Sequence, residues 1–317
     1  MNVRNAISCC SKYILLSLFA FIPTPASRAA DFDIRNQSEF QRLVPKNAEL
    51  KKLAGGMKFV EGPVWLAKGD GHLIFSNIPD EQLKKWDAVE GLTTFRTNTH
   101  SANGNCLDRQ GRLISCEGGA RRVSITELDG SVRVLVDQID GKKFNSPNDV
   151  VVKSDHSIWF TDPDYGLGSQ PREVAGLYVY RLEPKTGKIA AVVTDCDHPN
   201  GLCFSPDEKR LYVADSGKPH HIRVYDVDKA GAVSNGRIFC VIDKGVPDGI
   251  RCDTNGRVFS SAGDGVQIFD TKGELIGKIL VPEVPANLCF GGKDGKTLFI
   301  TARTSLYSIP VLVKGDK

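Results

Sequence analysis

Most of this chain is built from short apolar runs separated by turns rich in Gly, Asp, Asn or Lys. Such turn residues supply the backbone conformations and local hydrogen bonds that hairpins require. Each repeated unit is predicted to begin with an inner strand, at residues 64–66, 104–107, 150–152, 202–204, 250–252 and 288–290. Second strands are predicted at 113–114, 157–160, 211–214, 258–259 and 298–300, and third strands at 177–180, 221–225 and 266–269.

An oxygen-bearing side chain stands at or just before the first run of each unit. Successive residues of this set are 42, 45, 52, 48 and 39 positions apart, and they are Glu61, Asn103, Asn148, Asn200, Asp248 and Asn287. A strand-only repeat of this length is typical of propeller blades. The sequence therefore predicts an all-β fold, a six-bladed β-propeller, in which equivalent positions face one axis. Six oxygen-bearing side chains converging there would suit a hard cation.

Closing the ring requires the first and last blades to meet. Residues 306–309 end the sixth unit, and residues 49–53 precede the first, so we expect 49–53 to add the outer strand of the last blade. Closure removes exposed sheet edges, which invite aggregation. We place the propeller domain at 48–313 and a polar lead-in segment with some helical capacity at 30–47.

The first 29 residues have the pattern of a signal peptide. Arg4 and Lys12 give a basic start, residues 13–22 are apolar but too short for a stable membrane anchor, and small residues follow at Ser27 and Ala29. We expect cleavage after Ala29 or Ala30 and an exported protein, periplasmic or secreted, with no membrane attachment after cleavage. An uncleaved anchor is the alternative.

Charge and cysteine content exclude several classes of function. Removing residues 1–29 lowers the formal net charge from +3 to 0, and no long charged run remains, which disfavours nucleic acid as a partner. Seven cysteines remain, an odd number with no C-x-x-C spacing, so a structural zinc site is not expected. Export permits a disulfide such as Cys240–Cys252, whereas Cys106, Cys203 and Cys289 have the pattern of buried inner-strand residues.

Several segments carry a resemblance to a known family. They are Glu61-Gly62-Pro63-Val64-Trp65, Ser146-Pro147-Asn148-Asp149-Val150, Pro199-Asn200-Gly201-Leu202 and Pro247-Asp248-Gly249, and they resemble the signature segments of the gluconolactonase/senescence-marker-protein-30 family. Residues 160–166 and 300–307 resemble its bacterial gluconolactonase branch. The resemblance covers residues 48–312 and implies a six-bladed propeller with a central divalent metal, usually calcium, and hydrolysis of sugar lactones.

The resemblance also implies which residues hold the metal. The ligands carry over to Glu61, Asn148, Asn200 and Asp248, two carboxylates and two amides, an all-oxygen set that suits calcium. Animal members carry an Arg two residues before the third-blade Asn, where this chain has Ser146, so their substrate contacts do not transfer. For any single position, an Asn-Gly or Asp-Gly turn is the competing explanation.

Hydrolysis of a lactone at such a site needs a polarised carbonyl and an activated water. The metal would polarise the carbonyl and stabilise the oxyanion. We expect Asp248 to act as general base, with Glu61 as second choice. Asn103 is a candidate to bind a substrate hydroxyl, and a role in a turn is the alternative. Tyr165 is a candidate to cover the pocket, and ordinary packing in the fold is the alternative.

Two other functions stay open at this stage. An organophosphate hydrolase of the diisopropyl-fluorophosphatase type shares the propeller and a similar set of Glu, Asn and Asp ligands. The second open function is a non-catalytic propeller that binds a protein or a sugar, although the presence of two acids, Glu61 and Asp248, disfavours it. No Gly-x-Ser-x-Gly motif is present, which disfavours a serine esterase. The leading hypothesis is a metal-dependent lactonase acting on a small-molecule sugar lactone such as glucono-1,5-lactone.

Overall fold

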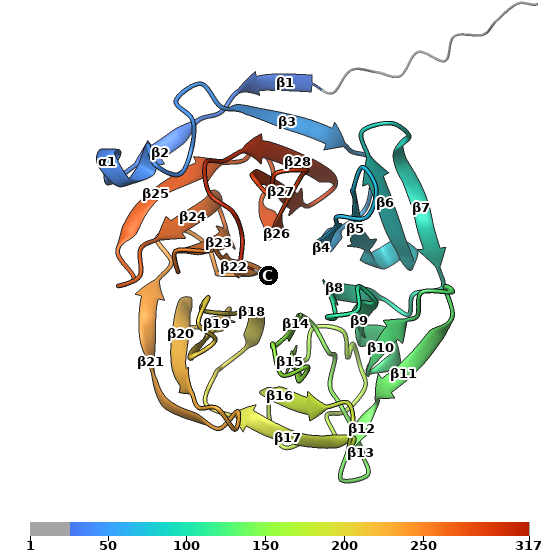
Figure 1. The fold of residues 1–317 in the computed structure, drawn as a ribbon. Helices are drawn as coiled ribbons and strands as arrows, with labels where there is room; N and C mark the ends of the chain where they lie inside the picture. The colour runs from blue at the N-terminus through green and yellow to red at the C-terminus, as the bar shows by residue number, and fades with distance from the viewer. Residues whose placement is uncertain (1–25, 317) are drawn as a thin grey trace, which may run out of the picture.

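The structure, a computed structural model, describes residues 26–316. Six antiparallel sheets of four or five strands surround one axis (Figure 1), which confirms the predicted six-bladed propeller. The expected signal peptide lies outside the described residues, except for its last four positions. No helix among residues 26–316 is long and apolar enough to cross a membrane.

The first three blades occupy residues 60–193. Blade 1 consists of β4 (Val60–Leu66), β5 (His72–Asn77), β6 (Gln82–Asp87) and β7 (Gly91–Thr97), with the 3-10 turn η1 (Ile78–Asp80). Blade 2 consists of β8 (Ala102–Leu107), β9 (Leu113–Glu117), β10 (Arg122–Thr126) and β11 (Val132–Val136), with the 3-10 turn η2 (Gly118–Ala120). A hairpin of β12 (Gln138–Ile139) and β13 (Lys142–Lys143) leads to blade 3, which consists of β14 (Val150–Val152), β15 (Ile158–Asp162), β16 (Tyr178–Glu183) and β17 (Lys188–Val193).

The last three blades include strands from the N-terminal segment. Blade 4 consists of β18 (Pro199–Phe204), β19 (Arg210–Asp215), β20 (His221–Val227) and β21 (Val233–Val241). Blade 5 consists of β22 (Ile250–Cys252), β23 (Val258–Ala262), β24 (Gly265–Phe269) and β25 (Leu275–Leu280), with β2 (Phe32–Ile34) added outside. Blade 6 consists of β26 (Pro285–Gly291), β27 (Thr297–Ala302) and β28 (Ser305–Pro310), followed by β3 (Glu49–Ala54) and β1 (Ala26–Ala29).

The ring closes as expected, because β3 pairs antiparallel with β28 and places Lys51 opposite Ser308. The lead-in before it docks on blade 5: β2 pairs with β25, and the single helix of the described chain, α1 (Gln37–Phe40), follows. Asn36 caps this helix by accepting the Glu39 N–H at 3.2 Å. The Phe40 ring, which is buried, packs edge-on against Phe32.

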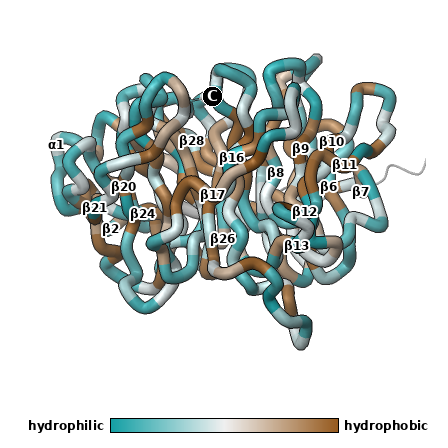
Figure 2. The backbone as a smooth tube through the Cα atoms, turned by 90° about the horizontal axis from the view of Figure 1, so that it is seen from below, coloured by the Kyte–Doolittle hydropathy of each residue, from teal (hydrophilic) through white to brown (hydrophobic). Residues whose placement is uncertain are grey.

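The two faces of the propeller differ. The β12–β13 hairpin projects from one face, and the C-terminal end lies on the other (Figure 2). On that second face, Gly315 forms a bridge with Asp253, just after the end of β22. The first strand of each blade therefore begins on the face of the hairpin, which we call the site face.

Apolar side chains fill the spaces between neighbouring blades. Trp159 and Val179 of blade 3, for example, share a buried cluster with Leu202 and Val213 of blade 4. The Cys240–Cys252 disulfide that export would permit is not formed in this structure, since all seven cysteines of the described chain are free thiols. Cys252 instead lies beside Cys203, with sulfurs 3.7 Å apart across blades 4 and 5.

Candidate active site

The six repeat residues lie where the first strands of neighbouring blades are bonded to one another on the site face. These bonds run from Asn105 Nδ2 to the Gly62 carbonyl (2.9 Å), from Gly104 N to the Asn148 carbonyl (2.7 Å), from Gly201 N to the Asp248 carbonyl (3.2 Å), from Gly249 N to the Ala286 carbonyl (2.8 Å) and from Asn287 Nδ2 to Glu61 Oε2 (2.9 Å). The structure thus gathers all six positions around the axis.

Glycines that follow these residues permit this close approach. A Cβ on Gly104, Gly201 or Gly249 would overlap the neighbouring blade, and none of these three glycines has a positive φ. They are therefore not turn glycines, although Asn-Gly and Asp-Gly suggest turns in the sequence. The dipeptides mark instead the points where one blade's backbone passes directly against the next.

Glu61 is a buried carboxylate whose position is fixed on two sides. Its Oε2 atom accepts the Gly62 N–H at 2.6 Å and the Asn287 amide at 2.9 Å. Burial, and next the nearby charge of Asp149, raises the pKa of Glu61 to about 7. No Lys, Arg or His of the described chain forms an ion pair with it.

Asp248 lies close to Glu61, since burial and then the charges of Glu61 and Asp149 raise the pKa of Asp248 well above its usual value. The side chain of Asn200 hydrogen-bonds to Asp248. Tyr165, on the connection after β15, reaches the same place: its hydroxyl contacts Asn200 and Ser216. Tyr165 is 51% exposed, so it stands at the mouth of the site and is not packed in a core.

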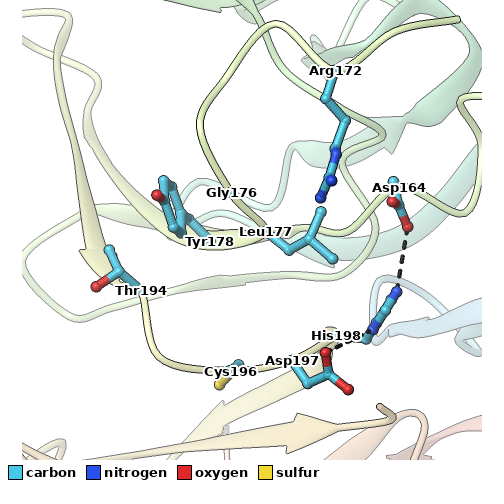
Figure 3. A pocket seen from close by; sticks show the side chains of 9 residues that line it. All are labelled: Asp164, Arg172, Gly176, Leu177, Tyr178, Thr194, Cys196, Asp197 and His198. Atoms are coloured by element: carbon cyan, nitrogen blue, oxygen red, sulfur yellow. Dashed lines mark ion pairs between the residues drawn. The ribbon is translucent and has the colours of Figure 1, made fainter. Parts of the chain in front are cut away.

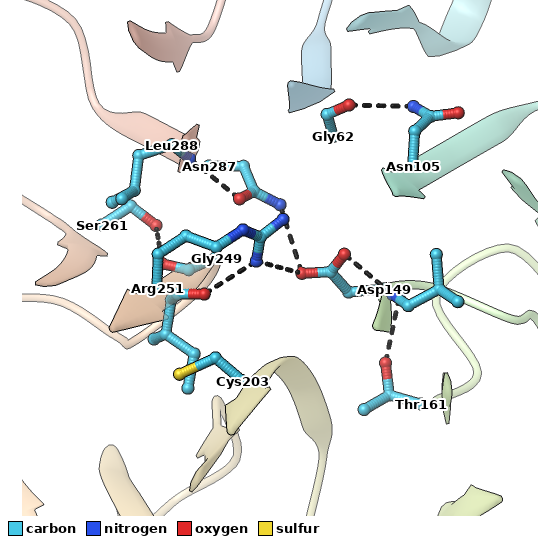
Figure 4. A network of polar contacts seen from close by, with 12 residues as sticks. Gly62, Asn105, Asp149, Thr161, Cys203, Gly249, Arg251, Ser261, Asn287 and Leu288 are labelled. Carbon is cyan, nitrogen blue, oxygen red and sulfur yellow. Dashed lines mark hydrogen bonds and ion pairs between the residues drawn. The ribbon is translucent and has the colours of Figure 1, made fainter. Parts of the chain in front are cut away.

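A second buried network supports these residues, and sequence reasoning missed it (Figure 4). Asp149 Oδ2 accepts the Arg251 guanidinium and the Asn287 amide, each at 3.4 Å. The same Asn287 amide donates to Glu61, so Asn287 bridges the two carboxylates. Arg251 pairs with Asp149 and only weakly offsets the raised pKa of Glu61, while neither Glu61 nor Asp248 forms an ion pair among the described residues.

The two remaining amides of the predicted set are also at the site. The Asn148 side chain makes no hydrogen bond to any described residue, while its backbone N–H and carbonyl are both bonded. The Asn103 Oδ1 atom is buried and has no hydrogen-bond partner in the described chain. A buried acceptor without a partner is costly, which points to a ligand group at this position.

The donors fit a hard divalent cation. Glu61 is buried and Asp248 is partly buried, and the charge of Glu61 raises the pKa of Asp248. A cation would stabilise both carboxylates in their ionised forms, and the neighbouring amides supply neutral oxygens. Within residues 26–316, no group of three or more His, Cys, Asp and Glu side chains is arranged to hold a metal. A metal here therefore depends on the mixed set of Glu61, Asp248, Asn148 and Asn200.

Comparisons with known proteins agree with this architecture. A family model for the SMP-30/gluconolactonase/LRE-like region matches residues 59–304. The chain is 33% identical over 290 residues to a gluconolactonase of Zymomonas mobilis, which covers 82% of this chain and 80% of that protein. It is 27% identical over 247 residues to a pentonolactonase of Haloferax volcanii, covering 76% and 80%. Its structure is similar to that of a gluconolactonase of Xanthomonas campestris, with a TM-score of 0.84, 34% identity and coverage of 92% and 99%.

Proposed function

Since the chain belongs to the SMP-30/gluconolactonase/LRE-like family, we propose that it hydrolyses a sugar lactone, such as glucono-1,5-lactone or a related aldonolactone, to the aldonic acid. Relatives named gluconolactonase and pentonolactonase support lactone hydrolysis as the reaction class. The observation that carries the proposal is the pair Glu61 and Asp248. Among the described residues neither carboxylate forms an ion pair, and both lie with amide oxygens where all six blades converge.

The proposal includes a divalent metal ion as cofactor, and calcium is the first candidate for this ion. Glu61, Asn148, Asn200 and Asp248 would hold it, with a net protein charge of −2 that the ion neutralises. When bound, the ion supplies Lewis-acid polarisation of the lactone carbonyl and stabilises the developing oxyanion. The family resemblance and the all-oxygen donor set support this choice of cofactor.

Asp248 is proposed as the general base. Its carboxylate takes a proton from a water whose oxygen bonds to the lactone carbonyl carbon. The ring C–O bond then breaks, and the released ring oxygen takes up a proton to become the hydroxyl of the aldonic acid. In the protein alone, burial and then the charge of Glu61 raise the pKa of Asp248. A bound cation would favour the ionised carboxylate, which is the form that accepts the proton. The hydrogen bond from Asn200 holds the Asp248 carboxylate in place.

Asn103 and Tyr165 are proposed to position the substrate. The unpartnered Asn103 Oδ1 can accept a hydrogen bond from a sugar hydroxyl. Tyr165 covers the mouth of the site beside Asn200, and burial raises its pKa to about 12, so its phenol stays protonated and can donate a hydrogen bond. An exported location, periplasmic or secreted, is part of the proposal and is supported by the basic and apolar pattern of the N-terminal segment.

A substrate panel tests the reaction class. Purified protein is assayed in a pH-indicator format with glucono-1,5-lactone and with diisopropyl fluorophosphate. We expect the lactone to be hydrolysed with the higher kcat/KM. Glu61→Gln should abolish most of this activity, whereas Glu90→Gln, an exposed acid of the same blade, should not. A folded protein that hydrolyses only the organophosphate, or neither compound, contradicts the proposal.

A further inference from the structure

One connection of the propeller is much longer than its equivalents. On the site face, the second and third strands of five blades are joined by two to five residues, but in blade 3 the connection 163–177 has fifteen. Loops of this length in compact domains are uncommon and often carry function. This loop is held in place: Gly166 N donates to Ser146 Oγ at 3.1 Å, and Glu173 pairs with Arg121 at 3.0 Å.

The long loop forms one wall of a pocket of about 420 Å³, within the range of about 300–1,000 Å³ for small-molecule sites. Residues 194–198, which lead into β18, form the opposite wall (Figure 3). The pocket adjoins the candidate active site, because the Tyr165 ring stacks on His198, with ring centroids 5.8 Å apart, while its hydroxyl contacts Asn200. His198 lines the pocket. The stacked rings of Tyr165 and His198, which we call the Tyr165–His198 wall, therefore connect the pocket to the candidate active site.

The side chains that line this pocket include both hydrogen-bond donors and hydrogen-bond acceptors. His198 lies between two carboxylates, with Nε2 at 3.5 Å from Asp164 and Nδ1 at 3.6 Å from Asp197. The Nδ1 atom has no hydrogen-bond partner in the described chain. Arg172 forms no ion pair or hydrogen bond within residues 26–316, and Figure 3 shows its side chain pointing from the loop toward the pocket.

The combination of cationic, anionic and neutral polar side chains in this pocket favours one class of ligand over others. An anionic group would be repelled by the carboxylates of Asp164 and Asp197. An apolar group would remove water from the charged side chains of the pocket without replacing the hydrogen bonds to that water. Hydroxyl groups both donate and accept, so a neutral polyhydroxylated ligand can satisfy Arg172, His198 and the two carboxylates together. The Tyr178 side chain offers an apolar surface and a phenol on the same wall.

We propose that this pocket binds the second sugar of a lactone that carries a glycosyl substituent, so that lactones of disaccharide acids are the preferred substrates. The inference rests on the proposed lactonase function and adds the substrate class. The lactone ring would lie at Asp248 and Asn200, and the attached sugar beyond the Tyr165–His198 wall. The reaction is unchanged: water adds to the carbonyl carbon, the ring C–O bond breaks, and the glycosidic bond stays intact.

The test compares kcat/KM for cellobiono-1,5-lactone, glucono-1,5-lactone and 6-phosphoglucono-1,5-lactone. We expect a preference of about tenfold or more for the disaccharide lactone over gluconolactone, a ratio that one or two added hydrogen bonds supply. Thr194→Trp, at an exposed position of the pocket wall, fills the space and should bring this ratio to about one. Arg172→Ala should lower the ratio several-fold, and Arg133→Ala, an exposed Arg of blade 2, should leave it unchanged.

Binding of cellobionate and gluconate by calorimetry separates this inference from the proposed function. Selective binding of cellobionate that is lost in Thr194→Trp, without hydrolysis of any lactone, supports the pocket and contradicts the lactonase. Hydrolysis of gluconolactone without preference for the disaccharide lactone, unaffected in both pocket variants, overturns the inference alone. Preference for the phosphorylated lactone that depends on Arg172 overturns it as well, because the pocket would then be an anion site.

Discussion

Glu61 and Asp248 are two carboxylates in one buried site, but their neighbours differ. Glu61 is fixed by the Gly62 N–H and the Asn287 amide on the same oxygen. Asp248 is bonded by Asn200 and lies near the exposed Tyr165. Groups of one type that are held differently take different roles in enzymes. Glu61 therefore suits a fixed ligand, and Asp248 suits proton transfer.

Asp248→Asn separates the role of base from that of ligand. The change keeps the size and one ligand oxygen but removes the proton acceptor, so we expect kcat to fall by a factor of about 10² to 10⁴ even at saturating metal. Asn148→Ala is the matched control, because the Asn148 side chain makes no hydrogen bond within the described chain. The change removes only a neutral oxygen and should be largely rescued by excess metal. Recovery of Asp248→Asn to within a few-fold of the parent by added metal would move the base to Glu61 or to bulk water.

Arg251→Met tests the charge balance beneath the site. The change leaves Asp149 buried and unpaired, which should destabilise the metal-free protein by about 3–5 kcal/mol. The uncompensated charge should at the same time strengthen calcium binding, so calcium should raise the melting temperature more than in the parent. The double variant Arg251→Met/Asp149→Asn should reverse both effects. Weaker calcium binding by the single variant would show that Arg251 acts only through packing.

Much of the site was predictable from single residues, because each ligand candidate occupies the same place in its own repeat. Asn103, Asn148 and Asn200 could be aligned without knowing any contact. The pair Arg251–Asp149 could not, since its partners are 102 residues apart and neither belongs to the aligned set. The only feature of the sequence that could have indicated this pair is that an acid, Asp149, directly follows the candidate ligand Asn148.

At the scale of the strand, the structure depends on how closely the first strands approach one another. Backbone groups of Gly104, Gly201 and Gly249 donate directly to the next blade or its preceding loop. The sequence showed these glycines as turn signals, because a dipeptide cannot distinguish a turn from a close approach between blades. Their crowded surroundings and the absence of a positive φ show that they are positions of close approach between blades.

Gly201→Ala should be strongly destabilising for this reason. The added Cβ would overlap the Asp248 carbonyl and the backbone of Gly249 and Ile250, none of which can rotate away. We expect the free energy of unfolding, measured in urea, to fall by about 1–3 kcal/mol. Gly55→Ala is the control, since its nearest contact is the flexible end of Lys52. Equal stability of the two variants would contradict the packing argument.

At the scale of the whole molecule, strands from the N-terminal segment complete blades 5 and 6. The sequence predicted closure through 49–53, and β3 pairs with β28 as expected. It did not predict that β2 would add a strand to blade 5, because residues 32–34 lack a strong strand pattern. β1 lies outside β3 and falls within the segment that we expect to be removed on export.

Intact-mass measurement on protein from the native host tests the export prediction. We expect a mature chain that begins at Ala30 or Asp31. Such a chain loses β1 but keeps β2, α1 and β3, so the closed ring and its melting temperature should be preserved. A recombinant chain starting at Ala30 provides the comparison. A mature protein that retains Met1 would show that the N-terminal segment is not a cleaved signal.

The central claim is that lactone hydrolysis depends on one divalent ion held at the axis. Its most direct test is a calcium titration of chelator-stripped protein, with calorimetry and glucono-1,5-lactone hydrolysis measured on the same samples. The account predicts negligible activity without metal and a rate that rises with occupancy of one site. Asn148→Ala should shift both curves to higher calcium by the same amount. Full activity in protein shown by elemental analysis to contain no metal would contradict the account.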